Sequence, residues 1–214
     1  FATENAVLLS AAESLNWENG KISSVALSGG RVAAGGAAGK VWVKAPKVDT
    51  IFEVGRGKNS QSVGAIAWRG TRDSLLAAAG PDGGVHVLSL EQGKLRESAV
   101  LLIPAAMDRK PVTALAFWPK TNFLVAGYEG GMVRVWDYKE EALLAQTQLH
   151  ETSVLAAAFD ADGANLVTVG ADGLERETRL RVKVFEHTWD LKEIFSLDGS
   201  AARTRFYLDS LNRL

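Results

Sequence analysis

Residues Gly127–Tyr138 read GYEGGMVRVWDY, and this stretch decides the fold. A glycine-rich turn opens it, and a strand pattern follows in which Val133 and Val135 alternate with larger residues. Glycine reaches positive φ without a Cβ clash, which a tight two-strand turn requires. A period of two along the chain is typical of a β-strand. The stretch therefore predicts a β-hairpin.

The same pattern recurs in four units along the chain. Each unit opens with an apolar segment, passes through a polar turn and a short apolar run, and reaches a glycine turn before a valine-rich strand; a weaker fourth strand closes it. The opening segments begin at Ile22, Val63, Val112 and Val154, at intervals of 41, 49 and 42 residues. The third strands are expected at Val41-Trp-Val43, Val85-His-Val87, Val133-Arg-Val-Trp136 and Val182-Lys-Val-Phe185. Such a period indicates stacked supersecondary units, and no helical pattern competes with it.

The repeats and the Val-Trp-Asp of residues 135–137 resemble the WD-repeat β-propeller family, and the resemblance covers essentially the whole chain. It implies an all-β propeller, in which four-stranded antiparallel blades stand radially around a channel. The expected blades are residues 22–54, 63–102, 112–147 and 154–197 of a single 1–214 propeller segment.

Two more apolar stretches lie outside these blades. Residues 6–10 read as an outer fourth strand and residues 204–208 as an inner first strand, so the two cannot complete one shared blade. The sequence thus predicts four complete blades plus a single strand at each end, in a partial or open ring. Uncovered edges and faces favour association. We therefore expect the remaining blades to come from the parent chain or from a partner.

The resemblance also implies a polar relay within a well-formed blade: a His before the first strand, a hydroxyl in the second, an Asp in the tight turn and a Trp in the third. Residue by residue, the last repeat supplies His150, Thr168 and Asp172 but not the Trp. The third repeat supplies Trp136 but lacks the hydroxyl and the turn Asp. No repeat is complete, so the resemblance rests on the period, the hairpin pattern and the Val-Trp-Asp. It implies a structural role for the relay residues.

Composition narrows the function classes. The chain has 214 residues, 47% of them hydrophobic, which is enough to bury a core. Its net charge of -1 gives no long-range electrostatic attraction to anionic partners. Nucleic-acid contact is expected only within a larger complex. The sequence has no cysteine, which fits an intracellular setting, cytoplasmic or nuclear. Its apolar runs are far shorter than the roughly 20 residues of a membrane helix, so no membrane partner is expected.

Polar residues that could carry chemistry are few. His86 is expected to pack between blades, His150 to belong to the relay and His187 to lie on the surface. Residues 160–163 lack the further ligands of a calcium loop, and residues 55–60 lack the spacing of a phosphate loop. We therefore expect no catalytic residue, no cofactor and no metal site.

Partners are expected on the face shared by the loops that join fourth to first strands and second to third strands. Residues 103–111 and 174–179 lengthen two of these loops, and Trp17 lies on another polar loop. Their mixed charge favours a protein surface over a phosphate backbone. The expected contact residues of this rim are Trp17, Arg56, Lys58, Arg109, Lys110, Tyr128, Glu151, Glu175, Arg176 and Arg203.

The leading hypothesis from the sequence is a non-enzymatic protein-interaction scaffold, a WD-repeat subunit of a larger eukaryotic intracellular complex. One alternative is a receptor that binds a peptide or modified tail at the rim. Another is a hydrolase of the propeller type. The family resemblance supplies the scaffold role.

Overall fold

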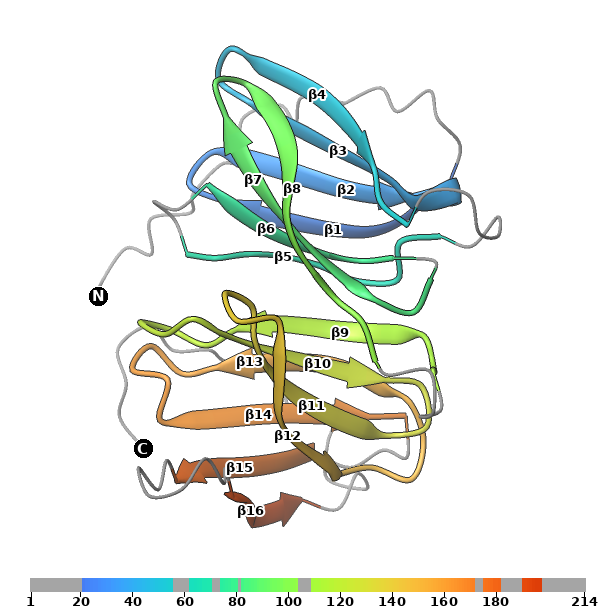
Figure 1. The fold of residues 1–214 in the computed structure, drawn as a ribbon. Coiled ribbons are helices and arrows are strands. Elements are labelled where there is room, and N and C mark those ends of the chain that lie inside the picture. The colour runs from blue at the N-terminus through green and yellow to red at the C-terminus, as the bar shows by residue number, and fades with distance from the viewer. Residues whose placement is uncertain are drawn as a thin grey trace, which may run out of the picture.

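The computed structural model describes residues 21–55, 62–70, 74–80, 82–103, 109–171, 175–181 and 190–197. These residues form four four-stranded antiparallel sheets in which the strands follow one another in chain order, with one short 3-10 turn at Ala37–Gly39. The sheets follow one another through the molecule from β1–β4 to β13–β16 (Figure 1). The predicted all-β fold of four-stranded blades is confirmed.

The four sheets are named here by their order in the chain. The first contains β1 (Ile22–Ser28), β2 (Arg31–Gly36), β3 (Lys40–Ala45) and β4 (Val48–Glu53). The second contains β5 (Ile66–Trp68), β6 (Leu75–Ala79), β7 (Val85–Glu91) and β8 (Lys94–Leu101). The third contains β9 (Val112–Phe117), β10 (Phe123–Tyr128), β11 (Met132–Asp137) and β12 (Ala142–Gln148). The fourth contains β13 (Val154–Phe159), β14 (Asn165–Gly170), β15 (Glu175–Arg181) and β16 (Asp190–Leu197).

The core lies between successive sheets. In the third sheet, Leu124 and Trp136 face a cluster that includes residues of the second sheet, while Val125 and Val135 face a cluster that includes residues of the fourth. Successive residues of a strand point to opposite faces of the sheet. A sheet that packs against a neighbour on each side therefore needs apolar residues at both odd and even positions of its strands. This explains why the strands read as nearly continuous apolar runs rather than as a polar and apolar alternation.

A valine at the start of a first strand (Val154) or just before one (Val63) packs directly against a glycine of the preceding sheet. A Cβ added to Gly127 would lie 2.6 Å from Cγ1 of Val154, and one added to Gly35 would lie 2.7 Å from Cβ of Val63. Both valines are fully buried. Glycine is required at these two positions because only a residue without a side chain lets the next sheet approach so closely.

Hydrogen bonds join the inner strands at the same places. The Ser23 and Ser24 hydroxyls donate to the Val63 carbonyl at 2.7 and 3.0 Å, and the Thr113 hydroxyl donates to the Val154 carbonyl at 2.6 Å. The carbonyl of the packed valine is therefore satisfied by the preceding sheet. Each contact combines close packing with a hydrogen bond, which fixes how one sheet sits on the next.

Arginine side chains link neighbouring sheets at the turns between first and second strands. The Arg31 guanidinium lies 4.5 Å from the centroid of the Trp68 ring, and that of Arg69 lies 5.6 Å from the Tyr138 ring centroid. Both distances are in the range of a cation–π contact. Each arginine thus contacts an aromatic ring of the next sheet along the chain.

The fourth sheet departs from the sequence prediction. Its third strand is β15, so the prediction that residues 174–179 form a loop before the strand is wrong. Val169 pairs with Glu175, and the pairing continues to Asn165 and Arg179. Backbone hydrogen bonds form this ladder, and they do not require the valine pattern that the prediction used. The expected strand at 182–185 and the expected single strands at 6–10 and 204–208 lie outside the described residues.

Replacing Gly127 by Ala should lower the free energy of unfolding by about 1–3 kcal/mol, because the new methyl group overlaps the Val154 side chain. Chemical denaturation of the intact protein measures the loss. The double variant G127A/V154A should recover part of it, since the smaller side chain relieves the overlap. Unchanged stability of G127A would contradict the packing described for these two sheets.

Candidate functional site

A polar residue recurs at one position of the third strand in the first three sheets. Trp42, His86 and Arg134 each lie opposite an alanine of the second strand, namely Ala34, Ala78 and Ala126. Equal register makes the three positions structurally equivalent. Each is the middle residue of a Val-x-Val segment.

Each of these side chains binds an acceptor on the fourth strand of its own sheet. The Trp42 indole N–H donates to Asp49 Oδ1 at 2.6 Å, and Arg134 Nε donates to Gln146 Oε1 at 3.1 Å. His86 Nδ1 lies 2.6 Å from Glu97 Oε1. The sequence analysis missed this arrangement, although the signal was present: the middle residue of the four Val-x-Val segments is Trp, His, Arg and Lys, and each is a hydrogen-bond donor. Lys183 lies outside the described residues.

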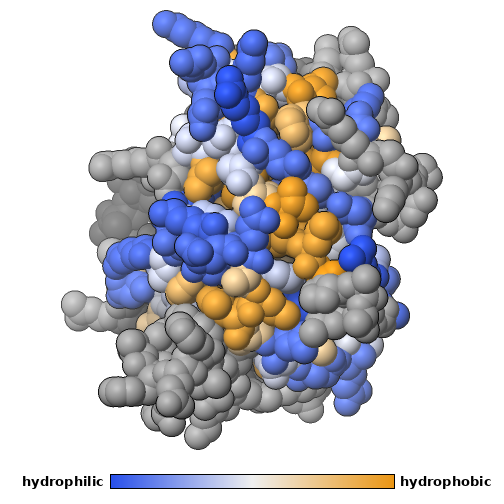
Figure 2. Space-filling view, in the orientation of Figure 1, coloured by the Kyte–Doolittle hydropathy of each residue, from blue (hydrophilic) through white to orange (hydrophobic). Residues whose placement is uncertain are grey.

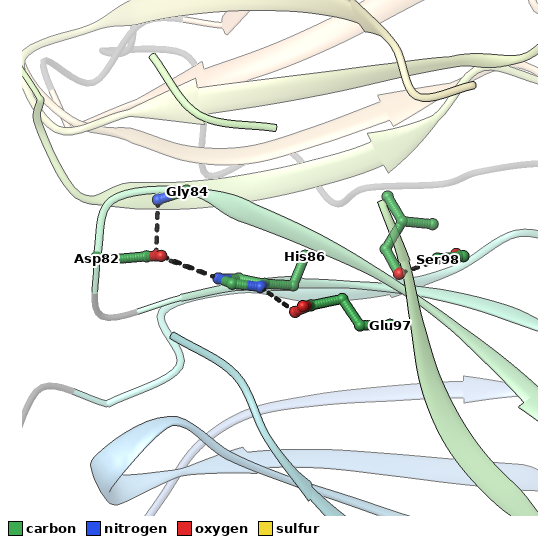
Figure 3. Close-up of polar contacts among 6 residues, drawn as sticks. Asp82, Gly84, His86, Glu97 and Ser98 are labelled. Atoms are coloured by element: carbon green, nitrogen blue, oxygen red, sulfur yellow. Dashed lines mark hydrogen bonds and ion pairs between the residues drawn. The ribbon is translucent and has the colours of Figure 1, made fainter. Parts of the chain in front are cut away.

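His86 has the most developed polar environment of the three (Figure 3). Its Nε2 lies 3.2 Å from both carboxylate oxygens of Asp82, in the turn between β6 and β7, while its Nδ1 faces Glu97 on β8. The Gly84 backbone N–H donates to Asp82 Oδ1 at 3.0 Å. A Cβ added to Gly80 would lie 2.5 Å from His86 Nε2, so the ring fits only because residue 80 is glycine.

A β-bulge brings Glu97 to His86. The pairing of β7 with β8 shifts by one residue between Val87 and Leu88, which leaves Ser98 as the extra residue. Its hydroxyl donates to the Val87 carbonyl at 2.9 Å. A bulge changes the face on which the following side chains lie. Glu97 is therefore opposite Leu88, on the same face of the sheet as His86.

The electrostatics of this cluster follow from its geometry. Burial lowers the pKa of His86, but the hydrogen bonds and charges of Asp82 and Glu97 together outweigh burial and raise that pKa above its ordinary value of 6.5. The hydrogen bond from His86 lowers the pKa of Asp82 below 3.8, against a smaller opposing effect of burial and with help from the Gly84 N–H. The position of the ring between Asp82 and Glu97 thus favours the protonated form of His86.

Two residues of the relay predicted for the last repeat lie in contact. His150 Nε2 lies 2.9 Å from the Thr168 hydroxyl, and both residues are almost fully buried. The backbone of His150 packs on the tight turn of the third sheet, where its N–H donates to the Gly131 carbonyl at 3.2 Å. His150 therefore contacts the third sheet through its backbone and the fourth through its ring. Asp172 lies outside the described residues.

The third sheet has no comparable relay around Trp136. The Trp136 indole nitrogen is buried and has no hydrogen-bond partner, and the same holds for the Tyr128 hydroxyl and Arg134 Nη1. Burial raises the pKa of Tyr128, although the neighbouring Trp136 and Arg134 act in the opposite direction. Trp136 therefore serves as a packing residue of the interface between the second and third sheets.

The residues expected on the rim fall into four groups. Arg109, Lys110 and Glu151 are exposed, and their contact with a partner stays a prediction. Tyr128 is not: its side chain is 0% exposed, with the Arg134 guanidinium 4.4 Å from its ring centroid. Tyr128 ends β10 and points toward the second sheet, so it offers no exposed surface to a partner.

Glu175 and Arg176 were expected in a loop and instead begin β15. The remaining predicted contact residues, Trp17, Arg56, Lys58 and Arg203, lie outside the described residues. The structure also places Arg109 and Lys110 beside the turn between β6 and β7, where a Cβ on Gly83 would lie 3.7 Å from Arg109 Cβ.

Among the residues that the structure describes, no three His, Asp or Glu side chains are grouped so that they could hold a metal ion. Within the same residues, no helix has the length and apolar character needed to cross a lipid bilayer. The polar clusters described above link strands and sheets to one another.

Comparison with known proteins agrees with this geometry. A family model described as the anaphase-promoting complex subunit 4 WD40 domain matches residues 32–102, and the model of the WD domain, G-beta repeat, matches residues 105–137. The chain belongs to the WD-repeat β-propeller family. The second match contains the Val-Trp-Asp of the third repeat.

Individual relatives are distant. WD repeat-containing protein 55 of Rattus norvegicus is 28% identical over 52% of this chain and 27% of its own length. Polycomb protein esc of Drosophila virilis is 26% identical over 61% of this chain and 30% of its own length. The chain thus spans less than a third of these WD-repeat relatives.

Solved structures share the fold. The β-propeller domain of Cps50 (Swd1) from Myceliophteria thermophila superposes with a TM-score of 0.65 at 14% identity, over 86% of this chain and 61% of that domain. The computationally designed Ika4 protein gives a TM-score of 0.60 at 25% identity, over 78% of this chain and 95% of its own. At 14% identity, the first of these likenesses shows the β-propeller fold alone.

Replacing Thr168 by Val should destabilise the protein by about 1–3 kcal/mol, because the change keeps the shape but leaves the buried His150 ring nitrogen without its partner. Thermal or denaturant unfolding measures the effect. Thr152→Val, at an exposed position near His150, is the matched control and should change stability by less than about 0.5 kcal/mol. Equal stability of the two variants would argue against a relay in the fourth sheet.

Proposed function

We propose that the chain is a non-enzymatic protein-interaction scaffold that acts as a WD-repeat subunit of a larger intracellular complex, in the cytoplasm or nucleus. Its partners are other protein subunits or peptides, and no cofactor takes part. The proposal is supported by family membership and by one structural observation, the exposed apolar face of the first sheet.

The first sheet presents apolar side chains on the face turned away from the second sheet. One face of the first sheet carries Ala33 and Val41 and packs on the second sheet. Val25 pairs with Ala34 and Leu27 pairs with Val32, so the side chains of Val25 and Leu27 lie on the other face. Val25 is 61% exposed and Leu27 is 76% exposed. Ile51, opposite Trp42 in the same sheet, is 49% exposed.

The equivalent positions of the next two sheets are covered. Ile66 pairs with Ala78, and Leu115 with Ala126, as Val25 pairs with Ala34; their exposures are 9% and 8%. Trp68 is the counterpart of Leu27 and is 9% exposed. A preceding sheet buries these side chains. Val25 and Leu27 of the first sheet are apolar like these buried residues but are exposed, which favours a partner that packs on them.

The occupant that fits this face is a further four-stranded blade, from the rest of the parent chain or from a partner subunit. The facing rows within the chain are made of small and branched residues, such as Ala33 and Val43 against the second sheet. A similar row would fit against Val25 and Leu27. The face visible in Figure 2 also mixes apolar patches with surrounding hydrophilic surface, which suits protein partners better than a nucleic-acid backbone.

The double variant V25E/L27E should weaken this association at least about tenfold, because it places two carboxylates in an apolar contact. The measurement is the assembly of the intact protein, followed by site-specific photo-cross-linking at residue 27. Leu102→Glu, which changes an exposed leucine elsewhere, is the control for charge alone. Cross-linking from residue 27 no stronger than from the exposed turn residue Glu140 would contradict the proposal.

Charge reversal at the rim distinguishes the scaffold from a peptide receptor. The variant R56E/R109E/R203E should leave association through the first sheet unchanged, since these residues lie in other segments of the chain. Quantitative co-purification with the partner identified by cross-linking measures the effect. Loss of binding in this variant, with V25E/L27E unaffected, would favour the receptor instead.

A further inference from the structure

We propose that His86 is a pH-sensitive tie that holds the edge strand β8 to β7: the protonated ring binds Asp82 and Glu97 at once, and loss of its proton releases Glu97. The inference concerns the second sheet alone and does not depend on the scaffold role.

The contacts of the ring require a proton on each nitrogen. Nδ1 lies 2.6 Å from Glu97 Oε1, and Nε2 lies 3.2 Å from Asp82 (Figure 3). A neutral imidazole has one N–H and one lone pair, whereas the imidazolium ion has two N–H groups. Both contacts are attractive only in the charged form. In the neutral form a nitrogen lone pair faces one of the carboxylates.

Glu97 is the carboxylate that leaves. Asp82 is held by the Gly84 N–H as well as by the ring, and its side chain is 20% exposed. The Glu97 side chain is 38% exposed, so it reaches water by a change of rotamer. It belongs to the outermost strand of its sheet, next to the bulged residue Ser98. Release of Glu97 therefore removes a cross-strand contact where the ladder is already irregular.

The same position is insensitive to pH in the neighbouring sheets. In the first sheet an indole N–H donates to Asp49, and in the third sheet an arginine donates to Gln146. Neither donor loses its proton near neutral pH. Among the three sheets in which this contact is described, a titratable donor occurs only in the second.

Among the described residues, two carboxylates face the His86 ring, while Arg109 and Lys110 lie beside the turn that carries Asp82. The charges that act on the ring are Asp82 from the turn and Glu97 from β8. The same face of β5, β6 and β7 carries Ile66, Ala78 and Leu88, and the packed face of the first sheet carries Ala33, Val41, Val43 and Val54. The His86 ring itself is thus buried against apolar residues, while its two carboxylate partners are partly exposed.

The direction of the pH dependence follows from the raised pKa of His86. A group whose pKa is higher in the folded state contributes stability that is complete below its unfolded value, near 6.5, and is lost as the pH rises through the folded value. Asp82 has a lowered pKa, so its contribution is complete above about 3.8 and is lost as the pH falls through its folded value. The tie is therefore strongest in mildly acidic solution and weakens on the alkaline side.

Hydrogen exchange of the intact protein tests the tie, with β12 as an internal reference for the edge strand of a non-titrating sheet. Protection of Lys94–Leu101 relative to Ala142–Gln148 should fall about tenfold as the pH rises through the His86 titration, which NMR of the imidazole signals locates above 6.5. His86→Arg copies the residue of the third sheet and should make the ratio independent of pH.

A ratio that stays constant with pH in the wild-type protein would overturn the proposal, as would an equal fall in H86R. Glu97→Gln provides a second test that keeps the acceptor oxygen but removes its charge. In E97Q the His86 titration should move to lower pH, and the loss of β8 protection should move with it. An unchanged titration in E97Q would show that Glu97 does not hold the proton on His86.

Discussion

The contact on which the structure depends is the one between an inner-strand valine and the sheet before it. Val63 and Val154 each fill the space above a glycine, and a hydroxyl of the preceding sheet binds the carbonyl of the same valine. A sheet that is apolar on both faces cannot be stable in water alone, so its neighbours are part of its own fold. Close approach at the inner strands sets the distance between sheets, and the clusters farther out pack within that distance.

Polar side chains add contacts within the sheets and between them. The third-strand donors tie the outermost strand to its sheet, where one edge of the ladder has no further strand to bind. His150 works across sheets instead, since its backbone lies on the third sheet and its ring binds Thr168 of the fourth. These contacts use residues that a search for catalytic chemistry would also select. Their burial and their partners show that they link strands and sheets to one another.

Most of the fold could be predicted because the spacing of the repeats can be read directly from the sequence. The opening segments and the Val-x-Val strands predict the order of β1 to β14, since most strands carry an apolar pattern and are bounded by glycine or polar turns, although β5 begins later and β8 earlier than predicted. β15 was missed because its seven residues, ERETRLR, pair through their backbone and lack that pattern. The site was harder to predict. The contact of Glu97 with His86 depends on a single bulged residue, and Tyr128 is buried because its side chain belongs to the strand rather than to the turn beside it.

The space above the packed valines also limits how the repeats can be rearranged. Gly35 and Gly127 occupy equivalent positions of the first and third sheets, but the second sheet has Ala79 there, against Val112. A duplicated copy of the first or third repeat would thus leave room at this position for the valine of its successor, whereas a copy of the second would present a methyl group there. The residue at this position, glycine or alanine, consequently determines which following repeat can pack on each sheet. This difference between the repeats limits the order in which they can be arranged.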